Sequence, residues 1–465
     1  MRPPAPPRAL RLLVVAALAL VAAATAAGCG DSHDYYSVEQ LMDATNCMEC
    51  HPQHYQEWSG SMHAYAADDP VFLAMNKRGQ EETNGELGDF CVNCHAPMAV
   101  RLGLTTDGLN LDEVPQYAKG VTCYFCHSVE SVGESHNNDI TLATDGIMRG
   151  GLSNPVASPK HAMMTSPLVD ADNQASSAMC GACHDVVTPA GVHLERTFEE
   201  WNDSIFASTD PATHLSCGQC HMKSRTDVAA EVPGLDVPLR QNGVRDHKFA
   251  GVDVALTPWP EKEAQLEAIQ GDLDPSLLPR LCVVPLEGGR IDYRLDDVGP
   301  GHMWPSGAAH DRRAWAEVIA YDADDNVLMQ TGVVLDGEDP DPVADPWIWE
   351  MRDYVYDADG APVKYFWEVR QTLTGLLPPS VTRDPSDPRF DHSVTRSWHV
   401  NEVFQDIARV TARVFIRPLP FEVLDDLMAS GHLTVDVRDQ LPTFELAGTE
   451  LEWRPELADL GGCVR

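Results

Sequence analysis

Regular alternation of apolar and polar residues is clearest in the second half of the chain. RIDYRLD (290–296) alternates as a half-buried strand does. The same reasoning predicts two strands around an Asp-Asn turn over 314–335, a hairpin with Asp-Gly in its turn over 354–369, and a strand over 409–419. A short helix over 421–431 is expected to end at its glycine. The pattern predicts a β-rich domain, residues 251–465, most simply an antiparallel sandwich.

The first 28 residues have the pattern of an export signal. Arg2, Arg8 and Arg11 precede an apolar run that ends in small residues, and no other stretch is apolar enough to span a bilayer. The run closes on A-A-G-C, which resembles a bacterial lipoprotein cleavage box with Cys29 as the lipidated residue, although Ala26 stands where leucine is usual. Ordinary cleavage nearby is the alternative. We expect a signal over 1–28, a linker over 29–45, and export to the periplasm or cell envelope on a lipid anchor.

Composition and charge narrow the choice of partners. The 465 residues are 43% hydrophobic and 22% charged, which is typical of a globular protein, and the formal net charge is −38. Such a surface repels nucleic acid and anionic lipid headgroups and attracts basic partners. A merely solvated acidic surface is the alternative reading. We therefore expect protein partners with basic docking surfaces and no nucleic acid.

Ten of the 13 cysteines repeat one pattern, C-x-x-C-H. It occurs as CMECH (47–51), CVNCH (91–95), CYFCH (123–127), CGACH (180–184) and CGQCH (217–221). Structural zinc usually takes two such cysteine pairs per ion and needs no histidine after each pair. Redox dithiols occur once per domain, at the start of a helix. Covalent haem c needs the whole pattern, because two cysteines form the thioethers and the histidine binds the proximal side of the iron.

The sequence therefore predicts five haem c groups, bound within residues 46–250. About 35 residues per haem are too few to enclose each macrocycle separately, so the haems must share a core. The proximal iron ligands would be His51, His95, His127, His184 and His221. The covalent attachments would be Cys47, Cys50, Cys91, Cys94, Cys123, Cys126, Cys180, Cys183, Cys217 and Cys220.

His63 is the first candidate for a distal ligand. In a straight helix it would lie about 18 Å from His51, so either Ser59-Gly60 breaks the helix or His63 reaches a neighbouring haem. YQEWSGSMHA (55–64) and FEEWNDSIFA (198–207) share one frame, in which Phe206 takes the place of His63. The shared tryptophans, Trp58 and Trp201, are expected to pack on porphyrin faces, and the unshared histidine is expected to bind iron.

These segments resemble multihaem cytochromes of the c-552/4 type. CxxCH followed by Y-x-x-W-x-x-S-x-H-A, the stretch GVTCYFCH (120–127) and the run from CGACH to CGQCHM (180–222) carry the resemblance, which covers about residues 45–250. That group includes tetrahaem electron carriers and is similar in haem stacking to hydroxylamine oxidoreductase and pentahaem nitrite reductase. The resemblance implies a helical, loop-rich domain with little regular structure beyond haem-supporting helices, and mostly bis-histidine haems in stacked or angled pairs.

The resemblance also suggests further distal ligands. It points to His161 in SPKHAMMTSPL, and His247 and His302 lie in similar turn segments flanked by glycine or proline. Because His302 lies in the β-rich domain, that domain is expected to dock on the haem domain. The fifth distal ligand would be His136, His193, His214 or none, with His33 and His54 as weaker candidates. We interpret the remaining histidines as ordinary side chains: His310, His392, His399 and His432.

Three functions are compatible with these features. The first is electron transfer between a quinol-side donor in the membrane and a terminal acceptor in the cell envelope, through redox protein partners. The second is a nitrogen- or sulfur-oxyanion reductase with one open iron. Pentahaem nitrite reductases usually have a lysine in one motif, and hydroxylamine oxidoreductase has eight haems, so this sequence departs from both. In the third, the β-rich domain is the working part, an adhesion or docking module, and the haems conduct electrons to or from it. Cys282 and Cys463 remain, either as a disulfide or as free thiols.

Overall fold

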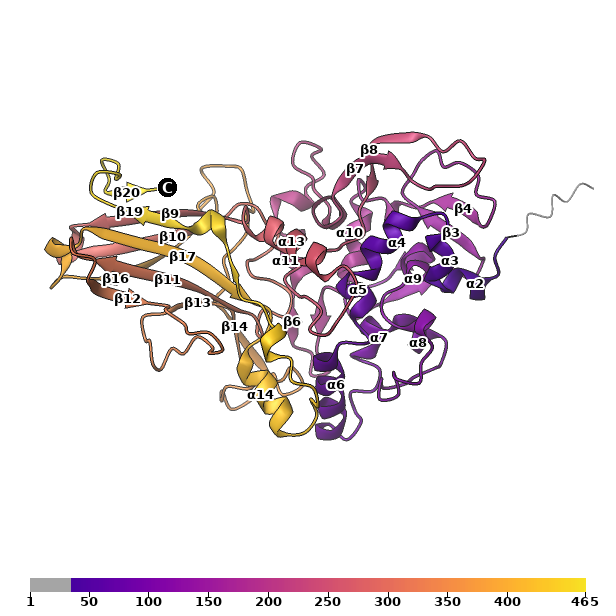
Figure 1. The fold of residues 1–465 in the computed structure, drawn as a ribbon, viewed down its shortest axis with the longest axis horizontal. Helices are drawn as coiled ribbons and strands as arrows, with labels where there is room; N and C mark the ends of the chain where they lie inside the picture. The colour runs from indigo at the N-terminus through magenta and orange to yellow at the C-terminus, as the bar shows by residue number, and fades with distance from the viewer. Residues whose placement is uncertain (1–34) are drawn as a thin grey trace, which may run out of the picture.

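The computed structural model describes residues 35–465. The expected export signal, Cys29 and His33 lie outside the described residues. Figure 1 shows two parts side by side, one built of short helices and loops and one built of long strands. Within the described residues, no helix is both long enough and apolar enough to cross a membrane.

The first part contains short helices and four two-stranded sheets. The small sheets, β1-β2, β3-β4, β5-β6 and β7-β8, add regular structure that the sequence did not predict. The helices are α2 (Val38–Met42), α3 (Ala44–Met48), α4 (Pro52–Ser59), α5 (Met62–Tyr65), α6 (Pro70–Glu82), α7 (Val92–His95), α8 (Pro97–Arg101), α9 (Cys123–His127), α10 (Ala175–Gly181), α11 (Thr197–Asn202) and α12 (Cys217–His221). The strands are β1 (Val129–Val132), β2 (Ile140–Leu142), β3 (Ile147–Gly150), β4 (Ala162–Thr165), β5 (Val186–Val187), β6 (His193–Glu195), β7 (Ser224–Val228) and β8 (Leu239–Arg245).

Side-chain caps start α9 and α12, two of the helices that carry C-x-x-C-H. Thr122 accepts a hydrogen bond from the backbone of Phe125 at the start of α9, and Ser216 forms a capping box with Gln219 at the start of α12. The helix after the first motif ends at Ser59, and Ser61 caps α5 beyond it. The break at Ser59-Gly60, one of the two alternatives that the sequence left open for His63, is therefore present.

The second part contains two antiparallel sheets. The four-stranded sheet has the order β16-β10-β9-β20, and the six-stranded sheet has the order β12-β11-β17-β18, with β13 paired to β11 and β19 to β17. The strands are β9 (Leu277–Val284), β10 (Arg290–Asp297), β11 (Arg313–Tyr321), β12 (Val327–Thr331), β13 (Trp349–Met351), β16 (Val394–His399), β17 (Arg409–Arg417), β18 (Phe444–Glu445), β19 (Leu451–Trp453) and β20 (Cys463–Val464). Two helices accompany the sheets, α13 (Lys262–Leu273) and α14 (Phe421–Ala429).

The two sheets share one buried core. Leu281 and Ile291 of the smaller sheet belong to the same buried cluster as Ala316 and Val414 of the larger one. Tyr293 of β10 meets Trp349 of β13 edge to face, with ring centroids 6.3 Å apart. The predicted strands at 290–296, 314–335 and 409–419 and the helix at 421–431 are confirmed. In β10 every second residue is buried, as the alternation requires.

The predicted hairpin over 354–369 is present only around its Asp-Gly turn. The backbone N–H of Asp357 donates to the Ala361 carbonyl at 2.9 Å, and that of Val363 donates to the Val355 carbonyl at 3.1 Å. Beyond this turn the prediction is wrong, because β14 (Asp353–Tyr356) pairs with β15 (Gln371–Thr374). Tyr365 and Trp367 are buried and stack on each other with ring centroids 4.7 Å apart. These aromatic residues pack at the boundary with the first part, and that burial outweighs their preference for a strand.

Cys282 and Cys463 form a disulfide that fixes β20 to β9. The two residues face each other in the antiparallel register, so the C-terminal segment completes the edge of the smaller sheet. Of the two alternatives that the sequence left open, the structure selects the disulfide.

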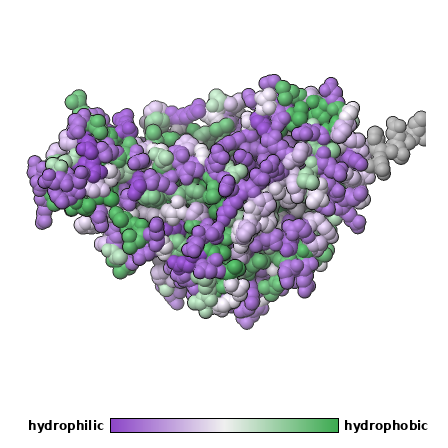
Figure 2. Space-filling view, in the orientation of Figure 1, coloured by the Kyte–Doolittle hydropathy of each residue, from purple (hydrophilic) through white to green (hydrophobic). Residues whose placement is uncertain are grey.

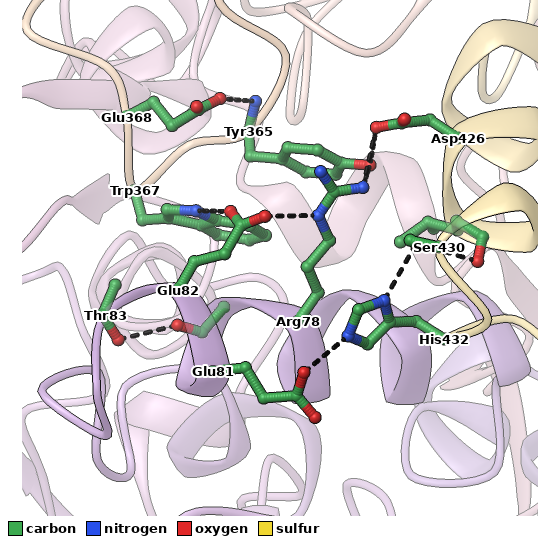
Figure 3. Close-up of polar contacts among 12 residues, drawn as sticks. Arg78, Glu81, Glu82, Thr83, Tyr365, Trp367, Glu368, Asp426, Ser430 and His432 are labelled. Atoms are coloured by element: carbon green, nitrogen blue, oxygen red, sulfur yellow. Dashed lines mark hydrogen bonds and ion pairs between the residues drawn. The ribbon is translucent and has the colours of Figure 1, made fainter.

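Packing and polar contacts join the two parts (Figure 3). Val71 and Ala74 of α6 belong to the same buried cluster as the two sheets. The Arg78 guanidinium donates to the Tyr365 hydroxyl at 2.8 Å and to the Asp426 carboxylate at 2.7 Å. Trp367 Nε1 donates to Glu82 Oε2 at 2.8 Å. The strand-rich part is thus docked on the helical part.

Candidate functional site

One cavity of about 1300 Å³ runs through the helical part and reaches the strand-rich part. Single-ligand pockets usually enclose about 300–1,000 Å³, so this cavity has more room than one small ligand needs. All ten motif cysteines and all five motif histidines line it. The ten cysteines are free thiols, available for thioether bonds.

Cysteines of different motifs touch one another inside the cavity. The thiols of Cys47 and Cys123 are in hydrogen-bonding contact, which joins the motifs at 47–51 and 123–127. Cys180 contacts Cys217 in the same way, which joins the motifs at 180–184 and 217–221.

Two further relationships connect those pairs. Cys183 is in hydrogen-bonding contact with Cys94, so the motif at 91–95 also adjoins the motif at 180–184. Cys126 is within electrostatic reach of Cys180 and Cys183. The motif at 180–184 is therefore the branch point among the five, with the motifs at 47–51, 91–95 and 217–221 at the ends.

Backbone carbonyls fix the orientation of most cavity imidazoles. His51 Nδ1 lies 2.8 Å from the Ala229 carbonyl oxygen, and His221 Nδ1 lies 2.8 Å from that of Ala250. A carbonyl can only accept, so each Nδ1 carries the proton and donates it, and each Nε2 keeps its lone pair for a metal. The same arrangement holds for His95, His127, His161, His247 and His302.

Three pairs of cavity histidines face each other at the separation that an intervening iron requires. A metal–imidazole bond is about 2.0–2.1 Å and a ring centroid lies about 1.1 Å behind its nitrogen, so two axial rings have centroids roughly 6.3 Å apart. The observed separations are 6.1 Å for His63–His184, 6.3 Å for His127–His247 and 6.4 Å for His221–His302. His63 therefore faces the histidine of a different motif from the one it follows in sequence.

Burial keeps these imidazoles in the neutral form that binds metals. Burial, with smaller contributions from the neighbouring His184 and His95, lowers the pKa of His63 to about 3. Burial also lowers the pKa of His302 to about 4, against the opposing hydrogen bond to Met303. The residues present thus fit haem c, with thiols for the thioethers and neutral imidazoles for the iron.

The other proposed distal ligands differ in placement. His161 lines the cavity and acts electrostatically on both His51 and His127. His136, His193 and His214 do not line the cavity.

Two histidines to which the sequence analysis gave little weight, His54 and His310, do line the cavity. His54 lies between His51 and His247, with ring centroids 5.9 and 4.7 Å away. The roles of all these histidines as iron ligands stay predictions.

The repeated tryptophan frame builds the same contact twice. Trp58 Nε1 donates to the Val121 carbonyl at 2.8 Å, and Trp201 Nε1 donates to the Leu215 carbonyl at 2.9 Å. Each acceptor is two residues before the first cysteine of a motif. Both tryptophans also line the cavity. The repeat therefore fixes the start of a motif helix in both copies, a role that sequence reasoning did not foresee.

Comparisons with known proteins agree with this geometry. Residues 46–128 match the family model of cytochrome c554 and c-prime. The solved structure of a penta-heme cytochrome c552 from Thermochromatium tepidum has the same fold, with a TM-score of 0.57 and 19% sequence identity over 90% of this chain and 99% of that chain. No curated protein matches this sequence.

The five motifs, the fold and the two likenesses together support a multihaem c-type cytochrome. Proteins of this class bind haem c and act in electron transfer or other haem-based redox chemistry.

Proposed function

We propose that the chain binds five haem c groups, one on each C-x-x-C-H motif, and carries electrons between a quinol-side donor in the membrane and a terminal acceptor in the cell envelope. The observation that supports this most directly is the single cavity, which all fifteen motif side chains line. Haem iron, when bound, supplies the change of valence by which electrons are carried. Neutral imidazoles on both sides of an iron favour a low reduction potential and leave little room for substrate.

The contacts between motifs favour a branched conductor. The motif at 180–184 adjoins three others and would be the branch point of this conductor. The ends of the conductor would be the motifs at 47–51, 91–95 and 217–221. Electrons would enter and leave near the ends at 47–51 and 217–221, where Met48, Glu49, Cys220 and His221 are exposed. The net charge of −38 favours redox partners with basic docking surfaces. On the face drawn in Figure 2, hydrophilic residues extend over both parts and hydrophobic residues form small separate groups.

Export and lipid anchoring at Cys29 belong to the same proposal. Haem c is attached outside the cytoplasm, and an acylated N-terminus would hold the protein near membrane donors. Replacing Cys29 by serine should release the protein from membranes into the soluble fraction. A Cys29→Ser variant that stays in the membrane fraction would contradict the anchor without affecting the haem count.

Mass spectrometry of the mature protein tests the haem count. The mass should exceed that of the polypeptide by five haems, and Cys47→Ser/Cys50→Ser should remove one. Cys282→Ser/Cys463→Ser is the matched control, because it also replaces two cysteines but should leave five haems. Fewer than five haems on the wild-type chain would contradict the proposal.

Electron transfer itself is tested by reduction kinetics. Membranes supplied with a reduced quinol analogue should reduce the anchored holoprotein, and a basic redox protein should then reoxidise it. The second step should slow as salt is added, because screening weakens the attraction between opposite charges. A holoprotein with five haems that neither reaction reduces or reoxidises would contradict the proposed role.

A further inference from the structure

The repeated tryptophan frame also repeats the residue before the tryptophan. Glu57 precedes Trp58 in the first copy, and Glu200 precedes Trp201 in the second. Each glutamate lies on the same short helix as its tryptophan, α4 in the first copy and α11 in the second. Both carboxyl groups accept a hydrogen bond from the backbone of a distant segment, and each of these segments carries a proposed distal histidine.

In the first copy, Glu57 holds the segment of His247. Glu57 Oε2 accepts from the backbone N–H of His247 at 3.0 Å. The Glu57 side chain is only 9% exposed, so water competes little for this bond. The adjacent Trp58 holds the start of the motif at 123–127, whose His127 faces His247. Glu57 and Trp58 therefore hold the two sides of one proposed iron site.

In the second copy, Glu200 holds the loop of His302. Its Oε2 accepts from the backbone N–H of the residue after His302 at 3.3 Å and from Ser306 Oγ at 2.6 Å. The adjacent Trp201 holds the start of the motif at 217–221, whose histidine faces His302. The same dipeptide thus contacts both sides of a second proposed iron site.

The histidine pairs held in this way are the two with nearly parallel rings. The ring planes are 16° apart for the pair that includes His247 and 13° apart for the pair that includes His302. In the His63–His184 pair, which has no hydrogen bond to either glutamate in the described chain, the planes are 52° apart. The rings of His247 and His302 also bond through Nδ1 to a carbonyl of their own segments. A glutamate that holds the segment therefore restricts the ring plane as well.

We propose that Glu57 and Glu200 are positioning residues, each of which fixes the ring of one distal histidine parallel to the ring of the motif histidine that faces it. With its tryptophan, each glutamate would set both axial ligands of one haem, at 123–127 in the first copy and at 217–221 in the second. Outer contacts of this kind orient metal ligands and tune the metal. This inference rests on the proposed haem binding and deepens it, because it names residues that set the ligand geometry of two haems.

The two sets of contacts form a duplicated unit. In each unit a motif is followed by the Glu-Trp dipeptide, and the dipeptide holds a later motif whose first cysteine touches a cysteine of the earlier one. The motifs are 47–51 and 123–127 in one unit and 180–184 and 217–221 in the other. Each dipeptide would therefore orient the haem beside the one that precedes it in the chain.

Electron paramagnetic resonance of the oxidised holoprotein tests the ring planes. Parallel imidazole planes give a low-spin iron a rhombic spectrum, whereas tilted planes give a signal at large g. The wild type should show at least two rhombic haems. Glu57→Ala should remove one of them and Glu200→Ala the other, each by one haem equivalent. Gln56→Ala and Glu199→Ala are the matched controls, because these exposed residues precede the glutamates in the two copies, and they should leave the spectrum unchanged.

All these variants should keep five haems, because no motif cysteine is changed. Alanine variants with five haems and the rhombic signals of the wild type would overturn this inference and leave the electron-transfer proposal intact. Fewer than five haems on the wild-type chain would contradict that proposal instead.

Glu200→Gln separates the hydrogen bond from the charge, and it supplies the test even where Glu200→Ala fails to fold. Both bonds to Glu200 end on one oxygen, and glutamine keeps such an oxygen. Glu200→Gln should therefore retain every rhombic signal of the wild type. Loss of a rhombic signal in this variant, with five haems bound, would overturn positioning through the hydrogen bond.

Discussion

The imidazole rings of His221 and His302 lie 6.4 Å apart and within 13° of parallel, although one belongs to a motif helix and the other to a loop of the strand-rich part. Glu200 holds that loop, because its carboxylate accepts from Ser306 Oγ at 2.6 Å and from the Met303 backbone at 3.3 Å. Binding of an iron between His221 and His302 would therefore depend on the docking of the strand-rich part, and that docking would in turn be strengthened by the iron.

Replacing His302 by alanine should open one iron. The low-spin signal should fall by one haem equivalent and the high-spin signal should rise by the same amount, because one iron loses its distal imidazole. Magnetic circular dichroism of the oxidised protein measures this change. His392→Ala is the matched control, since His392 bonds Ser380 and pairs with Asp296 away from the cavity. An unchanged spectrum for His302→Ala would refute the assignment of His302.

Glu200 should make stability depend on pH. Burial raises its pKa to about 7, outweighing the hydrogen bond from Ser306 that lowers it. Between the ordinary pKa of about 4.5 and pH 7 the folded protein keeps a proton that the unfolded chain releases, so the free energy of unfolding falls as pH rises through this window. Denaturant unfolding from pH 4.5 to 8 should show this fall.

Glu200→Gln should flatten that pH dependence. Above pH 7 its free energy of unfolding should exceed that of the wild type by about 1 kcal/mol, after allowance for solvent screening. Glutamine keeps an oxygen to accept from Ser306 and Met303. Glu199→Gln is the control, because Glu199 is exposed on the same helix, and its profile should follow the wild type. Parallel profiles for Glu200→Gln and the wild type would contradict the raised pKa.

The sequence predicts well those features whose residues are neighbours in the chain. Each C-x-x-C-H motif is complete within five residues, and the alternation in β10 needs only its own eight. The break at Ser59-Gly60 follows from local turn chemistry. Contacts between distant segments are different, because the spacing around His63 could not show that it faces His184.

The failed part of the hairpin prediction and the unforeseen placement of His310 have the same cause. The hairpin over 354–369 has the correct local pattern, but Tyr365 and Trp367 gain more from burial against α6 than from a strand. His310 looked ordinary because nothing in its neighbourhood along the chain marks it. Only the packing of the strand-rich part on the helical part makes it line the cavity.

Removing the disulfide should loosen the C-terminal edge of the smaller sheet. Cys282 and Cys463 are 181 residues apart in sequence, and a cross-link over so long a loop strongly restricts the unfolded chain. Cys282→Ser/Cys463→Ser should lose about 2–5 kcal/mol of unfolding free energy. Limited proteolysis should cut the C-terminal segment sooner, while the haem spectrum stays the same. Equal stability with and without the disulfide would contradict this expectation.

Arg78 should be the most sensitive polar contact between the two parts. Its guanidinium is largely buried, at 16% side-chain exposure, and joins Tyr365 and Asp426. Burial favours the neutral form of Asp426, but the hydrogen bonds from Tyr365 and Arg78 outweigh it and lower the pKa of that carboxyl. The contribution of Asp426 is then present above its ordinary pKa and is lost as the pH falls below about 4.

Arg78→Met keeps the apolar stem but removes the charge and the donors. We expect this variant to lose about 1–2 kcal/mol of unfolding free energy at pH 7, because the buried Tyr365 and the partly exposed Asp426 lose their donor. The loss should be smaller at pH 3. Lys77→Met is the control, since Lys77 is the exposed neighbour on the same helix and should change stability little. Denaturant unfolding at both pH values measures the difference. An equal loss at pH 3 and pH 7 would show that Arg78 contributes through packing rather than through its charge.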